Sequence, residues 1–312
     1  MLLGCHLEKE LSDIVARNCL RLSPQRVCTE IQNHIKDRAT QLHRHGAAVG
    51  LSGGLDSSVV ATLSSLALGP ANVLCLFMPE KHTSKESLKH ARLLANWLGA
   101  ELQIEDVTPR LEKFGVYRLI PRTLPGSLVR RLFDHYARKT GETPFSAGLL
   151  GARDQFVAAA NAFYRLKHRM RMLTLYYHAE LENLLVVGSA NKTEFSIGLF
   201  VQYGCDNAAD IMPLRSLYKT QVRQLAEYLA VPRVIIEKPP SPDLLPGLTD
   251  ESVIGVPYQT LDLILCGLEG GLSQQSIADE CSCSQNVIDY VEKLMDESRH
   301  KRNAPYVPDL FL

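Results

Sequence analysis

The chain has 312 residues, of which 46% are hydrophobic, and this is enough to build one large core with or without appendages. Its 34 Lys and Arg residues balance its 34 Asp and Glu residues, so no global positive field favours binding to nucleic acid. The longest apolar runs have only the length of a strand, and charged residues follow Met1 closely. We therefore expect a soluble globular protein of the cytoplasm, without a signal peptide or a membrane span.

The eight cysteines lie far apart in the sequence, except that a single residue separates Cys281 from Cys283. Neither a second pair nor a histidine at ligand spacing accompanies these two, whereas a structural zinc site takes four ligands. We therefore expect reduced thiols rather than a zinc site or a framework of disulfides.

Apolar residues at helical spacing predict two helices within residues 1–46, separated by a break at Ser23-Pro24. An alternation of strands and helices follows. Short apolar segments predict strands at 47–51, 73–78, 101–106 and 184–187, and longer periodic segments predict helices at 56–68 and 84–98. This alternation is typical of a doubly wound α/β fold, in which right-handed crossovers build a parallel sheet and the ligand crevice lies at the carboxyl ends of the strands.

Residues 115–150 interrupt the alternation, because prolines and glycines break the segment into short pieces. We expect a lid or an excursion from the sheet here. Its basic residues outnumber its acidic ones; they would attract an anionic ligand or simply keep an exposed loop soluble, and we slightly favour solubility. In the helix expected next, Arg165 and Arg169 share one face and Arg171 points elsewhere. These arginines would bind phosphate or carboxylate groups, or form ion pairs at the surface.

The first expected strand runs into Gly50-Leu51-Ser52-Gly53-Gly54-Leu55-Asp56-Ser57, which leads directly into a helix. The two adjacent glycines lack a Cβ, so their N–H groups can turn toward one point at the N-terminus of that helix, where an anion is stabilised. Serine hydroxyls add donors, and Asp56 supplies the oxygen ligand that Mg²⁺ prefers. The P-loop lysine is missing, so this is not a Walker A motif. The alternative is an ordinary Gly-Ser turn, but strand, glycines, aspartate and hydroxyls follow one another in the order that a nucleotide site requires.

The string S-G-G-L-D-S-S resembles the pyrophosphate loop of the ATP pyrophosphatases, which split ATP between its α and β phosphates. Further motifs follow it in order: L-L-V-V-G-S-A-N-K-T-E-F-S-I-G, A-A-D-I-M-P-L-R-S-L-Y-K-T-Q-V-R-Q-L-A, K-P-P-S-P-D-L-L-P-G-L-T-D-E and S-R-H-K-R. Together they resemble the ammonia-dependent NAD synthetases, from about Ile31 to Pro305. The resemblance implies an adenine nucleotide alpha hydrolase-like, Rossmann-like fold and a homodimer whose interface holds the dinucleotide substrate. No glutaminase domain of the amidase type is expected.

The whole chain, residues 1–312, is expected to form one domain of this kind. It would comprise the leading helices at 1–46, the irregular segment at 115–150 and a C-terminal helical segment at 258–312. Within the last of these, residues 273–295 have the pattern of a helix-turn-helix motif. The neutral charge of the chain, and the C-terminal helices that the resemblance implies, favour packing over DNA binding for this motif.

For ATP, the resemblance implies that the glycine-serine loop cradles the phosphates and that Asp56 and Glu194 bind Mg²⁺. Two carboxylates from separate strand ends can bridge a unit of metal and pyrophosphate, whereas Glu194 by itself would be interpreted as a solvated surface acid. The resemblance thus assigns catalysis to Asp56, Glu194 and Lys219, and ATP binding to Gly50, Leu51, Ser52, Gly53, Gly54, Leu55, Asp56, Ser57, Ser189, Lys219 and Ser241.

For the acceptor, the resemblance implies that deamido-NAD is bound by Arg169, Gln202, Asp210, His300 and Lys301. This part of the chain departs from the family pattern. Gln202 stands where the family has a lysine, and Arg165 stands where it has an asparagine. The family's Gly-Asp-Gly turn reads Gly204-Cys205-Asp206-Asn207 here, with one additional residue.

The reaction implied is that of a ligase forming C–N bonds. With Mg²⁺ as cofactor, ATP would adenylate the nicotinate carboxylate of deamido-NAD, pyrophosphate would leave, and ammonia would attack the acyl-adenylate to give NAD and AMP. One alternative is an ATP-pyrophosphatase-type ligase for a different carboxylate or a tRNA, and another is a non-catalytic nucleotide-binding protein. A thiolating tRNA enzyme should carry a persulfide cysteine or a basic RNA surface, and neither is evident in the sequence.

Overall fold

The computed structural model describes residues 20–119, 131, 135–151, 154–205, 207–241 and 249–303. Within these ranges the sheet contains β1 (Gly46–Gly50), β2 (Val73–Phe77), β3 (Glu101–Ile104) and β4 (Leu184–Val187), in the order β3-β2-β1-β4. Neighbouring strands are all parallel, and Ala48 of β1 lies opposite Leu74 of β2 and Val186 of β4. The predicted α/β fold with a parallel sheet is therefore confirmed.

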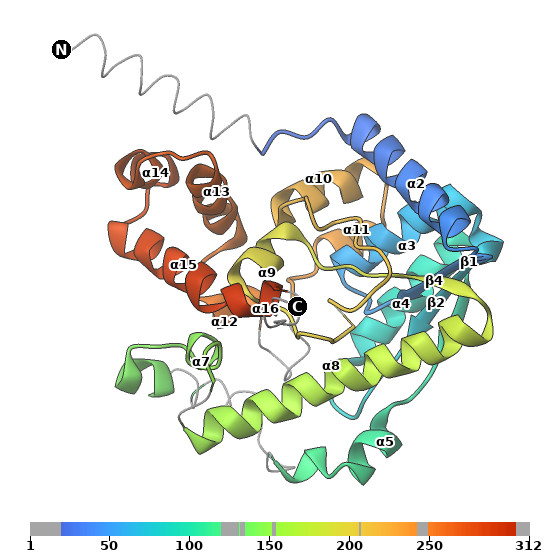
Figure 1. Ribbon diagram of the computed structural model, residues 1–312, viewed down its shortest axis with the longest axis horizontal. Coiled ribbons are helices and arrows are strands. Elements are labelled where there is room, and N and C mark those ends of the chain that lie inside the picture. The colour runs from blue at the N-terminus through green and yellow to red at the C-terminus, as the bar shows by residue number, and fades with distance from the viewer. Residues whose placement is uncertain are drawn as a thin grey trace, which may run out of the picture.

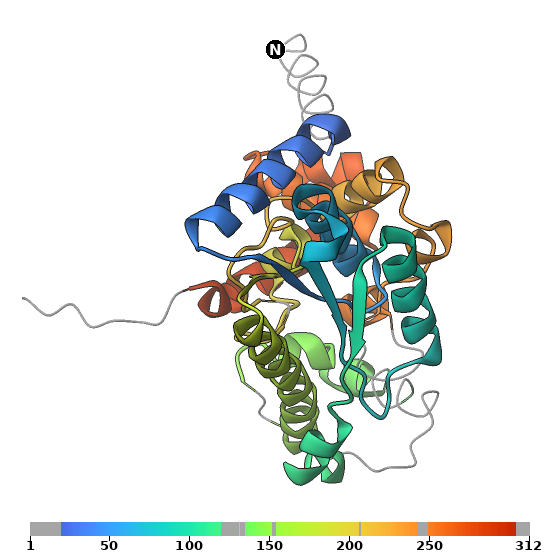
Figure 2. The same ribbon diagram turned by 90° about the vertical axis from the view of Figure 1, so that its right-hand side faces the viewer.

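Helices cover both faces of this sheet, because successive residues of a strand point to opposite sides. Ala47 and Val49 belong to a hydrophobic core with α2 (Pro24–Gln41), α3 (Leu55–Leu68), α4 (Lys85–Leu98), α10 (Lys219–Tyr228) and α11 (Arg233–Ile236). Ala48 belongs to a second core with α5 (Thr108–Lys113), η2 (Val116–Arg118) and α8 (Gln155–Leu181). Figure 1 and Figure 2 show α2 and α8 on opposite sides of the sheet. Since both faces are buried, the central strands are almost continuously apolar rather than alternating.

The C-terminal helices form a third hydrophobic core beside the sheet. It unites α9 (Lys192–Ile197) with α13 (Tyr258–Glu269), α14 (Gln274–Cys281) and α15 (Gln285–Glu297). The shorter elements are η1 (Pro70–Asn72), α7 (Pro144–Ala147), α12 (Asp250–Ile254) and α16 (Arg299–Arg302). Ile277 of α14 and Ile288 of α15 are buried in this core. The apolar faces of residues 273–295 are thus used for packing, which agrees with our preference for packing over DNA binding.

Some expectations fall outside the described residues. Residues 1–19 and 120–130 are among these, so the first expected helix and the lid role of 115–150 stay predictions. The single-domain assignment and the cytoplasmic location also stay predictions. In the described part of the chain, no helix combines the length and the apolar character that crossing a membrane requires.

The state of the cysteines differs in one place from the expectation. Cys28, Cys75, Cys205, Cys281 and Cys283 are free thiols. Cys266 is disulfide-bonded, so the expectation of reduced thiols is wrong for this residue. Spacing along the sequence does not reveal which sulfur atoms meet in the fold, and this is why the sequence pattern missed it.

Candidate active site

The glycine-serine loop joins the carboxyl end of β1 to the N-terminus of α3. Gly53 has a φ of 73°, and a Cβ at this position would lie 2.3 Å from the carbonyl oxygen of Ser87. Only glycine therefore fits here without strain. The loop is tied together by its own side chains, since the Ser52 and Ser57 hydroxyls lie 3.0 Å apart and Ser58 Oγ donates to the carbonyl of Gly54 at 2.7 Å. The result is a rigid turn at a helix N-terminus, a geometry that binds phosphate.

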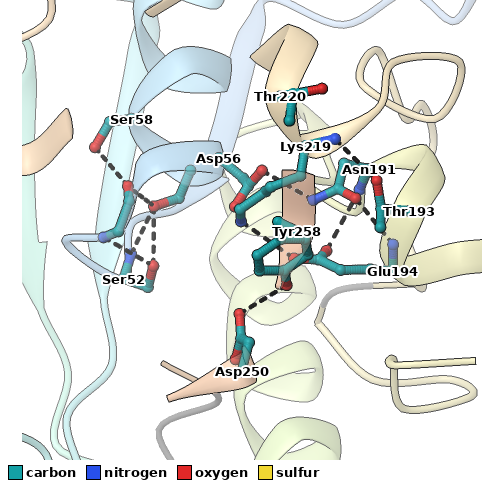
Figure 3. A network of polar contacts seen from close by, with 12 residues as sticks. Ser52, Asp56, Ser58, Asn191, Thr193, Glu194, Lys219, Thr220, Asp250 and Tyr258 are labelled. Atoms are coloured by element: carbon teal, nitrogen blue, oxygen red, sulfur yellow. Dashed lines mark hydrogen bonds and ion pairs between the residues drawn. The ribbon is translucent and has the colours of Figure 1, made fainter. Parts of the chain in front are cut away.

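Three charged side chains meet beside this loop (Figure 3). Asp56 lies in the first turn of α3, Glu194 in α9, and Lys219 at the first position of α10. Lys219 Nζ forms an ion pair with Asp56 and a second one with Glu194 at 3.3 Å. Asn191 Nδ2 donates to Asp56 Oδ1 at 3.0 Å. The three residues predicted to be catalytic are therefore brought together from distant parts of the chain.

The start of α9 fixes the position of Glu194. Asn191 is the N-cap residue, and its side chain accepts a hydrogen bond from the backbone N–H of Glu194 at 2.9 Å. The Glu194 side chain reaches back toward the backbone N–H of Asn191, which completes a capping box. Because the carboxylate is held by its own helix turn, it faces Lys219 in a defined orientation.

The cluster holds more negative than positive groups. Asp250 lies close by and accepts a hydrogen bond from Tyr258 Oη at 2.9 Å, so three carboxyl groups surround the ammonium group of Lys219. Burial, with the nearby charges of Asp56 and Asp250, raises the pKa of Glu194 above its usual value against the opposing effect of Lys219. Burial alone would lower the pKa of Lys219, but Asp56 and Glu194 raise it above its usual value. An additional cation would relieve the excess of negative charge.

The donor set of the cluster fits Mg²⁺. Asp56 and Glu194 both approach the same Lys219 Nζ, so their oxygens are near each other and near the phosphate loop. Mg²⁺ in nucleotide enzymes commonly takes one or two carboxylates, with phosphate oxygens and water as its other ligands. Within the described residues no group of three or more His, Cys, Asp or Glu side chains is arranged to hold a metal by itself. Asp56 and Glu194 could hold Mg²⁺ if phosphate oxygens and water supplied its other ligands.

A cavity of about 420 Å³ opens at this edge of the sheet. Of the residues predicted to bind ATP, all except Gly53 line it: Gly50, Leu51, Ser52, Gly54, Leu55, Asp56, Ser57, Ser189, Lys219 and Ser241. Glu194 also lines the cavity. The predicted loop, the carboxylate pair and the distant serines therefore belong to one continuous pocket.

Other residues of the cavity wall were not among the predicted site residues. After β2 the wall includes His82, Thr83, Ser84 and Ser87, and Lys238 lies near them with its Nζ donating to Ser87 Oγ at 3.0 Å. The sequence could have indicated the residues after β2. Because β2 is parallel to β1 and lies beside it, the segments that follow the two strands meet at the same edge of the sheet. Lys238 lies within K-P-P-S-P-D, a segment in which the resemblance assigns a role only to Ser241.

The arginines of α8 lie on different faces of the helix, as their spacing predicts. Arg171 reaches the cavity, where its Nε donates to the carbonyl of Met78 at 3.0 Å. Arg165 does not line this cavity; its Nη2 donates to the carbonyl of Gly148 at 2.9 Å beside a smaller cavity of about 70 Å³. The arginine on the other face of the helix is thus the one that meets the nucleotide cavity.

The residues predicted to bind deamido-NAD do not line the large cavity. The guanidinium of Arg169 donates to the backbone carbonyl of Gln202, with both nitrogens at 3.3 Å. Asp210 accepts from the backbone N–H of Val186 at 2.9 Å and from Tyr176 Oη at 3.2 Å. These two polar side chains therefore make bonds within the chain itself.

His300 and Lys301, which are also predicted to bind deamido-NAD, lie close to the C-terminus of the chain. Lys301 is buried and donates to the carbonyl oxygens of Gly198 and Phe200. His300 is exposed, and its Nδ1 lies 2.9 Å from the carbonyl oxygen of Glu297. The assignment of these residues to deamido-NAD stays a prediction.

The fold and the cavity define a nucleotide-binding α/β protein whose phosphate loop faces a pair of carboxylates. Residues 27–119 and 144–305 match the family model described as NAD synthase. The chain therefore belongs to the NAD synthase family.

Individual relatives agree with this membership. The chain is 40% identical to the NH(3)-dependent NAD(+) synthetase of Thermotoga neapolitana, with 92% of this chain and 99% of that protein covered. It is 38% identical to the protein of the same description from Methanocaldococcus jannaschii, with 92% and 98% covered. Among solved structures, NMN synthetase from Francisella tularensis superposes with a TM-score of 0.69 at 29% identity, over 93% of this chain and 100% of that one. The NH3-dependent NAD synthetase from Campylobacter jejuni gives 0.66 at 25% identity, over 92% and 100%.

Proposed function

We propose that the chain is an ammonia-dependent NAD synthetase, a ligase that converts deamido-NAD, ATP and ammonia into NAD, AMP and pyrophosphate. The observation that carries this proposal is the shared cavity in which the phosphate loop faces Asp56, Glu194 and Lys219. The curated relatives described as NH(3)-dependent NAD(+) synthetases, which match almost the whole chain, support the same activity.

In the first step, the adenylation of the carboxylate, different residues of the cavity have different roles. An oxygen of the nicotinate carboxylate attacks the α-phosphorus of ATP, and the bond from that phosphorus to the bridging oxygen of pyrophosphate breaks. The N–H groups at the start of α3 and the Lys219 ammonium stabilise the charge on the departing pyrophosphate. Asp56 and Glu194 would hold Mg²⁺, which supplies further neutralisation of the phosphate oxygens when it is bound.

The second step needs no protein nucleophile. Ammonia attacks the acyl carbon of the adenylate, the bond to the AMP oxygen breaks, and the surplus proton is released to solvent. Catalysis by the chain then consists of positioning and of charge stabilisation. The nearby Asp56 and Glu194 carboxylates raise the pKa of Lys219, which favours its charged form.

We propose in addition that the protein is a homodimer. Leu173, Tyr177 and Leu181 follow one another at four-residue spacing on α8, and their exposed fractions are 59%, 61% and 66%. Residues at this spacing share one face of a helix, so they form an apolar stripe that a second copy would cover. A symmetric pair is the commonest assembly of this kind.

The likeness to one solved structure supports a second candidate for the acceptor substrate. The structure described as NMN synthetase has a TM-score of 0.69 with this chain, and its product is a mononucleotide. Gln202 also lacks the positive charge of the lysine that the family carries at this position. Nicotinate mononucleotide is therefore the competing acceptor for the same adenylation chemistry.

The proposed function is tested by incubating the pure protein with ATP, Mg²⁺ and ammonia, and with deamido-NAD or nicotinate mononucleotide in separate reactions. Products are identified by mass. We expect AMP, pyrophosphate and NAD, and we expect Asp56→Ala and Glu194→Ala each to abolish metal-dependent turnover. Release of ADP would reject the chemistry. Amidation of the mononucleotide alone would leave the chemistry standing and replace the acceptor, and ATP binding without any turnover would indicate a non-catalytic nucleotide-binding protein.

A further inference from the structure

One wall of the nucleotide cavity is a short loop, residues 79–84, between β2 and α4. His82, Thr83 and Ser84 of this loop line the cavity. The loop begins at the carboxyl end of β2, which is the strand beside β1, and it ends at the N-cap of α4. It is therefore adjacent to the glycine-serine loop, whose Gly53 packs against Ser87. Any displacement of residues 79–84 changes the shape of the cavity.

The loop is organised around Glu80, a carboxylate with no exposed side-chain surface. Its backbone N–H donates to Thr83 Oγ1 at 2.9 Å, and the Thr83 N–H donates to its carbonyl at 2.8 Å. The Glu80 carboxylate accepts hydrogen bonds from the backbone N–H of His82 at 3.1 Å and from Tyr117 Oη at 2.8 Å. The conformation of the loop thus depends on where the carboxylate of Glu80 is held.

Lys167 of α8 holds that carboxylate. Its Nζ lies 2.8 Å from Glu80 Oε1, its side chain is also without exposed surface, and its Nζ lies 4.2 Å from the centre of the Phe163 ring. One helical turn later, Arg171 donates to the carbonyl of Met78 at 3.0 Å and to Thr83 Oγ1 at 3.4 Å. Two residues four apart on α8 therefore fasten the loop: Lys167 holds Glu80 itself, and Arg171 holds Met78 and Thr83 on either side of it.

A buried ion pair is a poor means of stabilising a fold. The desolvation of both charges offsets most of their attraction, and apolar residues of similar volume are often equally stable or more so. Separating the two groups, however, would leave an uncompensated buried charge, so the Glu80 carboxylate must stay where Lys167 can reach it. Neither Glu80 nor Lys167 lines the cavity, so both would act through the loop and not on the nucleotide.

We propose that the buried Glu80–Lys167 pair is a positioning device that holds residues 79–84 in the conformation that binds ATP. The inference rests on the proposed function, because it takes ATP as the occupant of the cavity. It assigns to the pair an effect on ATP affinity that is separate from the chemistry at Asp56 and Glu194.

The test uses the full chain and compares Glu80→Gln, Lys167→Met and the double variant Glu80→Gln/Lys167→Met. The double variant removes both charges and keeps the approximate volume, so it avoids an uncompensated buried charge. Calorimetry gives Kd for ATP with Mg²⁺ in the absence of acceptor, and steady-state kinetics give KM and kcat. We expect the Kd and KM for ATP to rise by about tenfold in the double variant, with kcat at saturating ATP close to that of the wild type.

Two further variants separate positioning from general loss of stability. Ile35→Val removes one methylene from a fully buried position of α2 far from the loop, and should lower the melting temperature without changing the Kd for ATP. Tyr117→Phe removes a single donor to Glu80 and should weaken ATP binding by a smaller factor, even if the double variant does not fold. An unchanged Kd for ATP in the folded variants would overturn the positioning role alone. A wild-type chain that did not bind ATP would overturn both this inference and the proposed function.

Discussion

Gln202 is predicted to bind the acceptor, and by the resemblance it stands where the family has a lysine. Its backbone carbonyl accepts from Arg169, and its side-chain amide donates to Tyr203 Oη at 3.4 Å. A charged hydrogen bond contributes about 1.5–3 kcal/mol against about 0.5–1.5 for a neutral one. We therefore expect Gln202→Lys to tighten deamido-NAD binding by roughly tenfold, as measured by calorimetry at two salt concentrations.

Arg165 provides the control for this prediction. It could have compensated for the missing lysine, but its guanidinium is bonded to the carbonyl of Gly148. Arg165→Asn should consequently lower the melting temperature and leave the Kd for deamido-NAD nearly unchanged. Loss of binding in Arg165→Asn, with no gain in Gln202→Lys, would instead support compensation by the arginine.

Glu80 gives the fold a specific dependence on pH. Burial alone would raise the pKa of its carboxyl, but hydrogen bonds from His82, Lys167 and Tyr117, together with the charge of Lys167, lower it from 4.5 to about 2. A pKa that is lower in the folded state stabilises the fold at pH values above the unfolded value. This contribution is present above about pH 4.5 and is lost as the pH falls toward 2.

Urea denaturation of the wild type and of Glu80→Gln between neutral and acid pH measures this effect. We expect the difference in unfolding free energy between the two proteins to shrink as the pH falls below about 4.5. Glu30→Gln is the matched control, because Glu30 forms an exposed ion pair with Arg26 and should show little difference at any pH. A Glu80→Gln difference that stayed constant with pH would contradict the shifted pKa.

At the scale of elements, the turn between β1 and α3 depends on Gly53 for two separate reasons. Its positive φ disfavours any other residue, and a Cβ would collide with the carbonyl oxygen of Ser87. We expect Gly53→Ala to displace the loop from α4 and to reduce ATP binding by more than tenfold, because the backbone N–H groups would no longer converge. Calorimetry with ATP and Mg²⁺ is the measurement.

A substitution at Gly99 tests the effect of the positive φ without the effect of the close contact. Its φ of 68° is nearly the same, but a Cβ there would meet nothing within 4 Å. Gly99→Ala should therefore cost only the backbone strain, about 1 kcal/mol of unfolding free energy, and leave ATP binding intact. Equal losses of ATP affinity in the two variants would show that close packing against Ser87 is not what the loop needs.

At the scale of the whole molecule, the exposed apolar stripe on α8 predicts the state of assembly. Light scattering should give about twice the monomer mass of 34.7 kDa. Leu181→Glu should shift the protein toward the monomer, because an unpaired charge would be buried at the interface. Phe114→Glu is the control, since Phe114 is equally exposed at 66% but lies outside this stripe. A monomer mass for the wild type would reject the dimer.

The positions of the strands along the chain and the phosphate loop could be predicted from the sequence because both depend on neighbouring residues. A run of apolar residues ending in Ser52-Gly53-Gly54 contains its own strand, its own turn and its own helix N-terminus. The carboxylate Glu194 was reached only through the resemblance of the motif around it, since an acid on a short helix has no distinguishing local pattern.

Which other side chains line or support the cavity depends on the tertiary structure. Glu80 and Lys167 are 87 residues apart in sequence, and nothing local to either indicates that both side chains are buried against each other. The rotation of α8 about its axis sends Arg171 toward the cavity and Arg165 toward Gly148. That rotation is fixed by packing against the sheet, because the helix must bury its apolar residues on the second core, and only the folded chain specifies which polar side chains then face the nucleotide.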